Sequence, residues 1–553
     1  MPDTLKITLA QHNQSVGDIA GNAAGILAAR ERARESDLIV FPELHLIGYP
    51  PEDLVLKPSL IERAAAELER LAQATARRGP AMLVGSAFVL DGALHNGVAL
   101  LDHGKVAAVR LKHELPNYGT FDELRLFHAG PLPEPVVVRG TMVGVPISED
   151  IWRPEVSRHL ADFGAEILVC INGSPYEINK EALRIAGVAK RRAVDTGLPL
   201  AYLNRVGGQD ELVFDGASFV VNGDGSLPVQ LRDWEEQEVE TRWTKTVPGW
   251  RCDRGELQPL ASHPEDIYCA MVLALRDRIE RSGLAGVALA LDGGLDSAVG
   301  AAIAVDALGP DRVWTALIPA RGADPADGAR AEALSQALGC RYREIPIVTA
   351  LDGGERMLAE AGLSSGPDHF PGHGPGHGPD QGLAMRLRST VLLALAERHG
   401  AMPLATSNKT VLGLGGALPG DMAGRFNPLR DAYASTVLDL ARWRNRERPR
   451  IGLGPQGPLI PESLLETGTI AGGGNGLPPL AELDAILKGL IEHDKSVEQL
   501  AADGYARDTV RHIEDLLHRG EALRRQAAPG VKLTALNFGR DRRYPMTHAY
   551  RSG

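Results

Sequence analysis

The first half of the chain alternates short apolar runs with longer segments in which apolar positions recur at helical spacing. The apolar runs predict strands at 5–10, 37–41, 81–88, 106–111, 142–147, 165–171 and 198–204. The helical spacing predicts helices at 19–35, Leu60–Ala76 and Ile178–Asp195. Because strands and helices alternate, we expect layers of helices packed against sheets.

The second half begins after a break in this pattern. Periodicity is lost around 242–263, where the segment VPGWRCDRGELQPL is typical of a linker. Beyond it the pattern predicts a helix at 265–283, an apolar strand that starts at Val287 and a helix at 298–309. We therefore predict a domain at 1–245, a linker at 246–263 and a second domain at 264–553.

Composition and charge narrow the functional classes. A length of 553 residues is enough for two large domains or three smaller ones. The net charge of −12 argues against a general binder of nucleic acids or anionic membranes. Four cysteines without metal-binding spacing are too few for a disulfide framework: Cys170, Cys252, Cys269 and Cys340. The chain shows no signal-type segment and no apolar stretch of about 18 residues, so a cytoplasmic protein is expected.

The stretch Val287–Ser297 carries the most specific signal of the second half. Its apolar strand breaks into Gly293-Gly294, and Asp296-Ser297 precede an alanine-rich helical segment. A strand, a glycine turn and a helix aim backbone N–H groups and a helix N-terminus at phosphate. The loop is not of the Walker type, because no Gly-Lys-Ser/Thr follows. A glycine pair after a strand is also common in ordinary tight turns.

Three clusters of the first half contain residues suited to catalysis. Glu43 ends a predicted strand in FPEL, Lys112 and Glu123 lie in LKHELPNYGTFDELRLF, and Ser148 ends a strand in VGVPISEDIW. Each residue alone has an ordinary structural interpretation, as a helix cap, a surface charge or a turn residue. Their combination changes this interpretation.

The three clusters together resemble the Glu–Lys–Cys triad of the nitrilase superfamily. The segments YPPEDL (49–54), LPNYG (115–119) and GGQDELVFDG (207–216) narrow the resemblance to the glutamine-dependent NAD synthetase family. The loop at 292–297 resembles the Ser-Gly-Gly-x-Asp-Ser loop of N-type ATP pyrophosphatases, and matches up to the C-terminal FGRDRRYP extend the resemblance over essentially the whole chain. The implied fold is α/β: a four-layer α/β/β/α nitrilase-like sandwich, then a doubly wound parallel α/β domain.

The resemblance implies that the first domain hydrolyses glutamine to glutamate and ammonia. Glu43 matches the general base, Lys112 the oxyanion-stabilising lysine, Glu123 a supporting carboxylate and Ser148 the nucleophile position. Six further positions match residues that hold the glutamine: Tyr49, Tyr118, Phe121, Glu149, Ser174 and Lys180. Ammonia would then travel inside the protein to the second domain.

In the second domain, the resemblance implies that ATP adenylates nicotinic acid adenine dinucleotide and that ammonia displaces AMP to give NAD, with magnesium on the phosphates. Family members form homo-oligomers, and neither nucleic acid nor membrane is an expected partner. The positions that match ATP or dinucleotide contacts are Asp292, Gly293, Gly294, Leu295, Asp296, Ser297, Arg386, Thr406, Asn408, Lys409 and Asp431.

The nucleophile position departs from the family pattern. Ser148 stands where the family has cysteine, and a thiol ionises far more readily than a hydroxyl. Serine needs a histidine-type base, which a Glu/Lys pair shaped for a thiol does not supply. We expect glutamine turnover to fall by orders of magnitude while glutamine binding survives.

The synthetase positions depart further. Asp292 replaces the loop serine and points a carboxylate at a polyanion, with a repulsion of about 4 kcal/mol per phosphate charge. Val411 replaces a glutamate beside the metal and cannot ligate magnesium, so the metal ligands stay unassigned. Ala434 and Leu523 replace lysines, and a glycine-rich TGTIAGGGNG (467–476) replaces a family motif. In contrast, Asp421, Asp431, Arg542 and Arg543 are retained.

The segment 364–382 lies outside the family pattern. Glycine and proline dominate it and predict a loop without regular structure, and its histidines His369, His373 and His377 have a spacing that could bind zinc or nickel weakly.

Three functional interpretations remain. We expect first a preserved fold with lost or severely impaired catalysis, next a working synthetase that tolerates the substitutions, and last a slow serine amidase.

Overall fold

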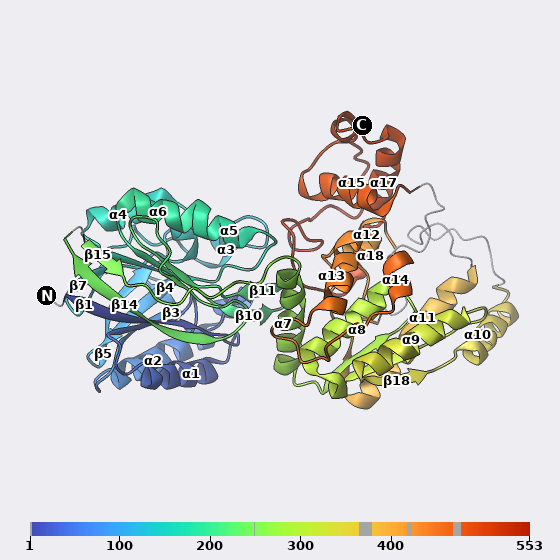
Figure 1. Cartoon of the computed structure of the whole chain (residues 1–553), viewed down its shortest axis with the longest axis horizontal. Helices are drawn as coiled ribbons and strands as arrows, with labels where there is room; N and C mark the ends of the chain where they lie inside the picture. The colour runs from blue at the N-terminus through green and yellow to red at the C-terminus, as the bar shows by residue number, and fades with distance from the viewer. Residues whose placement is uncertain (1–2, 248, 364–378, 417–422, 468–476, 553) are drawn as a thin grey trace. The chain divides into compact units, whose positions relative to one another are not determined.

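The computed structural model divides into two compact units (Figure 1). It describes residues 3–247, 249–363, 379–416, 423–467 and 477–552. The first unit comprises Met1–Gln209 and Val213–Ala261, and the second comprises Asp210–Leu212 and Ser262–Gly553. Several predictions fall outside the described residues: the histidines His369, His373 and His377, Asp421, and all but the first residue of the segment at 467–476.

Two sheets form the inside of the first unit. The larger has the order β15-β14-β1-β2-β3-β4-β5, and the smaller has the order β13-β12-β9-β8-β7-β6. The larger consists of β1 (Thr4–Gln11), β2 (Leu38–Val40), β3 (Ala81–Leu90), β4 (Ala93–Asp102), β5 (Lys105–Leu111), β14 (Gln237–Thr246) and β15 (Gly249–Cys252). The smaller consists of β6 (Val136–Val138), β7 (Thr141–Gly144), β8 (Ile167–Asn172), β9 (Leu200–Asn204), β12 (Phe219–Val221) and β13 (Val229–Gln230). A separate hairpin pairs β10 (Val206–Gln209) with β11 (Leu212–Asp215).

Alternate residues of the two sheets form the core between them. Ile7 of β1 and Ile171 of β8 belong to one buried cluster, and burying each such side chain contributes about 1.5–3 kcal/mol. The other face of β8 carries Leu168 and Cys170, which pack in a second cluster with α4 (Pro154–Asp162) and α6 (Lys190–Thr196). The helices α1 (Ile19–Arg32) and α2 (Pro58–Ala74) cover the larger sheet (Figure 1). The predicted four-layer sandwich is therefore confirmed.

The second unit contains a parallel sheet in the order β18-β17-β16-β19. Its strands are β16 (Gly286–Ala290), β17 (Val313–Leu317), β18 (Arg341–Glu344) and β19 (Ala401–Pro403). Ala288 of β16 packs with Leu392 of α11 (Pro379–His399), whereas Leu289 points to the other face, close to Gly300 of α8 (Leu295–Leu308). Helices therefore cover both faces, which confirms the doubly wound fold. The strand order reverses beside β16, and ligands of such sheets bind outside the strand ends at that point.

Further helices complete this unit. They are α7 (Glu265–Ser282), α9 (Pro325–Leu338), α10 (Val348–Glu360), α12 (Lys409–Gly413), α13 (Ala434–Arg446), α14 (Glu462–Thr467), α15 (Leu480–Glu492), α16 (Val497–Ala502), α17 (Arg507–Arg519) and α18 (Glu521–Gln526). A buried ion pair ties α13 to α8, because Arg444 Nε lies 2.6 Å from Asp306 Oδ2. No helix of the described ranges combines the length and apolar composition needed to cross a bilayer.

Three segments differ from the sequence prediction. Within the expected linker, residues 249–252 form β15, because Trp250 and Cys252 alternate into the inter-sheet core while the strand pairs with β14. Residues 379–382, expected in a loop, begin α11. The single helix expected at 178–195 consists of α5 (Lys180–Ala182), a π-helical segment at Leu183–Ala189 and α6.

Candidate functional sites

The first site is a buried cluster of one amine and two carboxylates in the first unit. Lys112, directly after β5, donates from Nζ to Glu43 Oε1 at 2.8 Å and to Glu123 Oε1 and Oε2 at 2.9 and 2.8 Å. Glu43 follows β2, and Glu123 opens the short helix α3 (Glu123–Leu126). The side chains of Lys112 and Glu43 are fully buried, and that of Glu123 is 7% exposed. The structure thus brings together three of the four predicted catalytic residues.

Burial and mutual contact set the charges of this cluster. Burial raises the pKa of Glu123 to about 7, although the ammonium of Lys112 opposes the shift. Burial lowers the pKa of Lys112, but Glu123 and Glu43 more than offset this effect, so the pKa lies above its ordinary value. The amine is therefore charged throughout the physiological range, while Glu123 titrates near neutrality.

Two groups that the sequence did not point to hold Glu43 in place. Asn96 Nδ2 donates to Glu43 Oε1 at 2.8 Å, and Gly173 N donates to Glu43 Oε2 at 2.9 Å. Asn96 is fully buried in the middle of β4. An asparagine at the start of the apolar run 97–101 was the available signal, because an amide that becomes buried needs hydrogen-bond partners.

Ser148 lies at a sharp turn next to this cluster. Its φ is +50°, a left-handed value that is uncommon outside glycine. Ile147 pairs with Ile171, which places Ser148 near the carboxyl ends of the strands, where Gly173, the residue that holds Glu43, also lies. Within the described ranges, Ser148 Oγ has no hydrogen-bond partner and therefore no base in contact.

Cys170 provides a thiol close to this turn but not a substitute nucleophile. Its side chain is fully buried in the cluster that packs against α4 and α6. Burial raises the pKa of this thiol well above its ordinary range, although Asn172 and the backbone of Ser148 oppose the shift. A protonated, inaccessible thiol does not attack an amide.

Asp150 connects the serine turn to the lysine strand. Its Oδ1 accepts hydrogen bonds from His113 N at 3.1 Å and Glu114 N at 2.7 Å, and its Oδ2 accepts one from Ile147 N at 3.0 Å. One fully buried carboxylate thus fixes the backbone on both sides of the site. This residue was not predicted from the sequence, although it lies two positions after Ser148.

Asp150→Asn is expected to lower the free energy of unfolding by about 1–3 kcal/mol, because an amide group cannot accept on both sides and leaves a buried N–H unsatisfied. The shift of the urea midpoint, corrected for slope, measures this cost. Asp162→Asn, on the exposed surface of α4, is the matched control and should stay within about 0.5 kcal/mol of the wild type. Equal behaviour of the two variants would contradict the bridging role.

The predicted glutamine-binding residues divide into two groups. Tyr118 OH donates to Glu149 Oε2 at 2.9 Å, and the rings of Tyr118 and Phe121 lie 5.7 Å apart. Lys180 Nζ lies 5.9 Å from the Phe121 ring centroid, so these four residues form a partly exposed group.

The other two predicted glutamine-binding residues are buried. Tyr49 OH donates to Glu123 Oε1 at 3.4 Å, and Ser174 N donates to Asn204 Oδ1 at 2.9 Å. The contact of both groups with glutamine stays a prediction.

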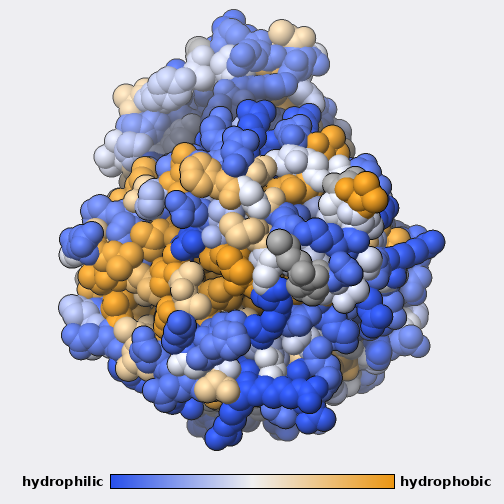
Figure 2. Space-filling model, turned by 90° about the vertical axis from the view of Figure 1, so that its left-hand side faces the viewer, coloured by the Kyte–Doolittle hydropathy of each residue, from blue (hydrophilic) through white to orange (hydrophobic). Residues whose placement is uncertain are grey.

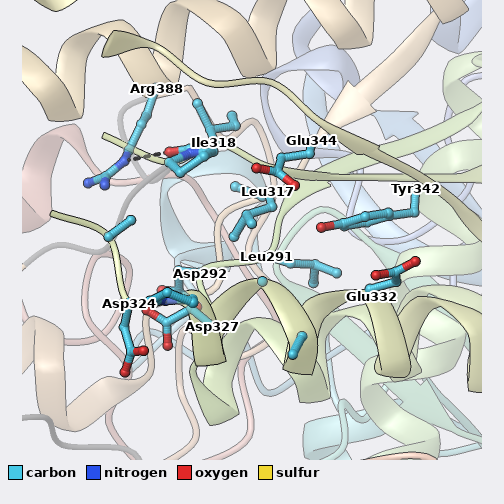
Figure 3. Close-up of a pocket in the computed structure, with 16 residues that line it drawn as sticks. Leu291, Asp292, Leu317, Ile318, Asp324, Asp327, Glu332, Tyr342, Glu344 and Arg388 are labelled. Carbon is cyan, nitrogen blue, oxygen red and sulfur yellow. Dashed lines mark hydrogen bonds between the residues drawn. The ribbon is translucent and has the colours of Figure 1, made fainter. Parts of the chain in front are cut away.

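The second site is a cavity of about 690 Å³ at the carboxyl ends of β16 and β17 (Figure 3). Apolar side chains such as Leu291 and Leu317 line part of it. Five carboxylates also line it: Asp292, Asp324, Asp327, Glu332 and Glu344. Arg388, whose Nε donates to Ile318 O at 3.0 Å, is the one cationic side chain among the described lining residues. The cavity therefore carries an excess of negative charge.

Asp292 folds back onto the loop that the sequence assigns to phosphate. Its Oδ1 accepts hydrogen bonds from Gly294 N at 2.9 Å and from Ser297 Oγ at 2.5 Å. These donors are the groups that a strand–loop–helix turn offers to a phosphate oxygen. Because Asp292 already engages them, and because carboxylates dominate the cavity, the residues present do not fit a triphosphate.

Other predicted nucleotide positions take part in internal networks. Lys409 is fully buried, and its Nζ donates to Thr534 Oγ1 at 2.6 Å and Leu536 O at 2.9 Å and pairs with Asp431 Oδ1 at 2.9 Å. Asn408 Nδ2 donates to Asp296 Oδ2 at 2.8 Å, which links α12 to the start of α8. Thr406 and the next residue, Ser407, are buried as well. Their contact with a dinucleotide stays a prediction.

Arg386 and Arg388 lie two positions apart on α11. Arg388 lines the cavity, whereas the exposed Arg386 donates from Nη1 to Gly382 O at 3.3 Å, one turn earlier. Residues two apart on a helix do not share a face, so one of the two arginines faces the cavity. The sequence pattern pointed to Arg386, whose contact with a nucleotide stays a prediction, and the structure adds Arg388 as the arginine that lines the cavity.

The position of Val411 supplies no metal ligand. Its backbone N donates to Asn408 Oδ1 at 2.9 Å and so completes the N-cap of α12. Within the described ranges, no group of three or more His, Cys, Asp or Glu side chains is arranged to hold a metal ion.

Known proteins resemble the chain over both units. Residues 6–243 match the family Carbon-nitrogen hydrolase, and residues 267–527 match the family NAD synthase. The glutamine-dependent NAD(+) synthetase of Rhodobacter capsulatus is 40% identical over 560 residues, and that of Xylella fastidiosa (strain Temecula1 / ATCC 700964) is 37% identical over 557 residues. In both comparisons the match covers 100% of each chain.

Solved structures agree with these matches. The glutamine-dependent NAD+ synthetase from Acinetobacter baumannii, in complex with adenosine diphosphate, has a TM-score of 0.76 at 33% identity and 98% coverage of both chains. A glutamine-dependent NAD(+) synthetase from Cytophaga hutchinsonii, at 19% identity and a TM-score of 0.81, shows the shared fold. With its full-length relatives, its two matched families and its lysine–carboxylate cluster, the chain belongs to the glutamine-dependent NAD(+) synthetase family.

Proposed function

We propose that this chain retains the scaffold and glutamine recognition of a glutamine-dependent NAD synthetase, and that both of its catalytic centres are inactive or severely impaired. One observation carries the proposal for the first unit. The cluster of Glu43, Lys112 and Glu123 is complete and hydrogen-bonded, but the side chain at the nucleophile turn is the hydroxyl of Ser148 without a base in contact. A hydroxyl that makes no hydrogen bond to Glu43 or to another base is not activated for attack.

The second unit supports the same conclusion independently. A relative at 33% identity was solved with ADP, so a nucleotide is the ligand class expected for the cavity beside the loop. In this chain, Asp292 engages the loop donors and Val411 stands where the family places a glutamate near the metal. We therefore propose that the chain has lost the magnesium-dependent adenylation of its substrate by ATP.

A working glutamine-dependent NAD synthetase is the second candidate. The observation that favours it is the retention of the buried cluster in the first unit together with 33–40% identity to full-length relatives. In that case glutamine, ATP and nicotinic acid adenine dinucleotide would be its substrates. The two candidate functions share the same fold and differ in catalytic activity.

Self-assembly in the cytoplasm is part of the proposal. Figure 2 shows apolar side chains that gather in a patch on the face it presents. Separately, residues of α2, β3 and β5 line an apolar groove of about 670 Å³ that includes Phe88, Val89 and, just before α2, Leu56. Apolar surface of this kind is typical of contact between protein subunits, which supports a homo-oligomer.

An isotope-resolved assay of the purified chain tests the proposal. Glutamine labelled on the amide nitrogen is supplied with ATP, magnesium and nicotinic acid adenine dinucleotide, and both glutamate and labelled NAD are followed. A parallel reaction with free ammonia examines the second unit alone. We expect both products at background level from protein that melts cooperatively, whereas labelled NAD above background would establish the working enzyme.

A further inference from the structure

The carboxylate of Asp292 has the surroundings of a bound phosphate. A backbone N–H from Gly294 and the hydroxyl of Ser297 converge on one of its oxygens at 2.9 and 2.5 Å. Ser297 lies in the first turn of α8, whose N-terminus attracts negative charge. These are the features by which a strand–loop–helix turn holds a phosphate oxygen, and here a side chain of the same loop satisfies them.

We propose that Asp292 is a built-in occupant of the phosphate position and that it makes the cavity select a nucleoside over a nucleotide. The inference rests on the proposed function in one respect, namely that this cavity is the nucleotide pocket of the family. It adds the ligand class that the substituted pocket takes, which is an adenosine-like molecule without phosphate. Asp292 thereby becomes the residue that determines specificity.

The loop is held from outside as well as from within. Arg330 Nε donates to Gly293 O at 3.1 Å, and the same guanidinium pairs with Asp327. Gly293 has a φ of +78°, and a Cβ at this position would lie 2.6 Å from Asp327 Oδ1, so the turn packs closely on α9. The loop is therefore fixed in the conformation in which Asp292 reaches its donors.

The remaining lining suits a ligand without phosphate. A volume of about 690 Å³ accommodates a nucleoside, and such pockets typically measure roughly 300–1,000 Å³. Leu291 and Leu317 offer apolar surface to a base, and carboxylates such as Glu344 are acceptors for amino and hydroxyl groups. In Figure 3, Asp292, Asp324 and Asp327 lie together on one side of the cavity, and Arg388 lies apart from them.

ATP and adenosine therefore make different demands on this loop. For ATP to bind in the loop, the carboxylate of Asp292 must leave, lose both hydrogen bonds and then remain close to the phosphates it repels. Adenosine requires neither change. Occupancy by the carboxylate and repulsion by its charge are two separate effects, and a suitable pair of substitutions separates them.

Calorimetric titration of the full-length chain with adenosine, ATP and inorganic pyrophosphate, each with magnesium, tests the inference. We expect the wild type to bind adenosine at least about tenfold more tightly than ATP and to show no pyrophosphate binding. Asp292→Ser frees the loop donors and is expected to raise ATP affinity at least about 100-fold, with adenosine affinity changed less than about threefold. Such a gain corresponds to about 2.7 kcal/mol.

Asp292→Asn separates occupancy from charge. The amide oxygen still accepts from Gly294 N and Ser297 Oγ, so this variant keeps the occupant without its charge. We expect it to recover less than about a tenth of the serine variant's gain in ATP affinity. Glu344→Gln, which removes a carboxylate of the same cavity outside the loop, is the matched control and should change ATP affinity less than about threefold.

Several results would overturn the inference. They are ATP binding to the wild type at least as tightly as adenosine, no binding of either ligand, no gain with serine, or an equal gain with asparagine and serine. Failure of the proposed function is separate from these outcomes. NAD formation by the wild type would refute impaired catalysis, whereas the ratio of ATP to adenosine affinity decides the role of Asp292 in either case.

Discussion

Replacing Ser148 with cysteine is expected to raise glutamine hydrolysis at least about a hundredfold, while NAD formation stays at background. A thiol is partly ionised near neutral pH and is intrinsically nucleophilic, whereas a hydroxyl depends on a base that is not in contact here. The buried cluster of Glu43, Lys112 and Glu123 is already assembled to serve a thiol. A hundredfold gain corresponds to about 2.7 kcal/mol of transition-state stabilisation. Glutamate release by the purified variant measures it.

Three companion variants define the source of any gain. Ser148→Ala sets the baseline. Adding Glu43→Gln to the cysteine variant should remove the gain, because the carboxylate acts as the base. Adding Cys170→Ala should leave the gain intact, because that buried thiol takes no part. A cysteine variant that is folded but inert would show that the first site is altered beyond its nucleophile.

Lys112→Met is expected to lower the free energy of unfolding by about 3–5 kcal/mol at pH 8. The substitution leaves Glu43 and Glu123 buried together without their shared cation, and breaking a buried pair on one side leaves an uncompensated charge. Lys105→Met, at the exposed start of the same strand, is the matched control and should cost less than about 0.5 kcal/mol. Urea unfolding followed at several pH values measures both variants.

The cost of Lys112→Met should depend on pH in one direction. The pKa of Glu123 in the folded wild type is about 7, above its ordinary value of 4.5, and removing the ammonium that lowers it raises it further. In both proteins the folded chain binds a proton at Glu123 that the unfolded chain releases, so both lose stability as pH rises above about 5. The wild type levels off above about pH 7, whereas the variant continues to lose stability, so the cost of the substitution grows above about pH 7. A destabilisation that is constant between pH 5 and pH 8 would contradict the pairing.

Much of the fold was predictable because local pattern and tertiary packing agree. The strand at 81–88 and the helix at Leu60–Ala76 are found as β3 and α2. The sequence pattern missed β4, where His95 and Asn96 interrupt an apolar run, because these polar residues find partners that lie far away in the sequence. Within the expected linker, β15 forms because it pairs with β14, the strand directly before it in the sequence, and this pairing carries no clear periodic signal.

The candidate sites were predictable where a motif names the residue itself. The residues Glu43, Lys112 and Glu123 come together from two separate segments, as the resemblance implied. The partners that orient them were not predictable, since Asn96 and Asp150 act through contacts that only the folded chain creates. Charge counting suggested repulsion by Asp292 but could not show that its carboxylate turns back onto its own loop.

The hydrogen bonds of Asp292 within its own loop also determine at which stage the loop becomes ordered. A loop that waits for a ligand loses conformational entropy at the moment of binding. Here the carboxylate, Gly294 and Ser297 close the loop during folding, so the chain carries its own template for that conformation. We therefore expect the loop to be ordered without a bound nucleotide, so that its order does not depend on the nucleotide concentration in the cell.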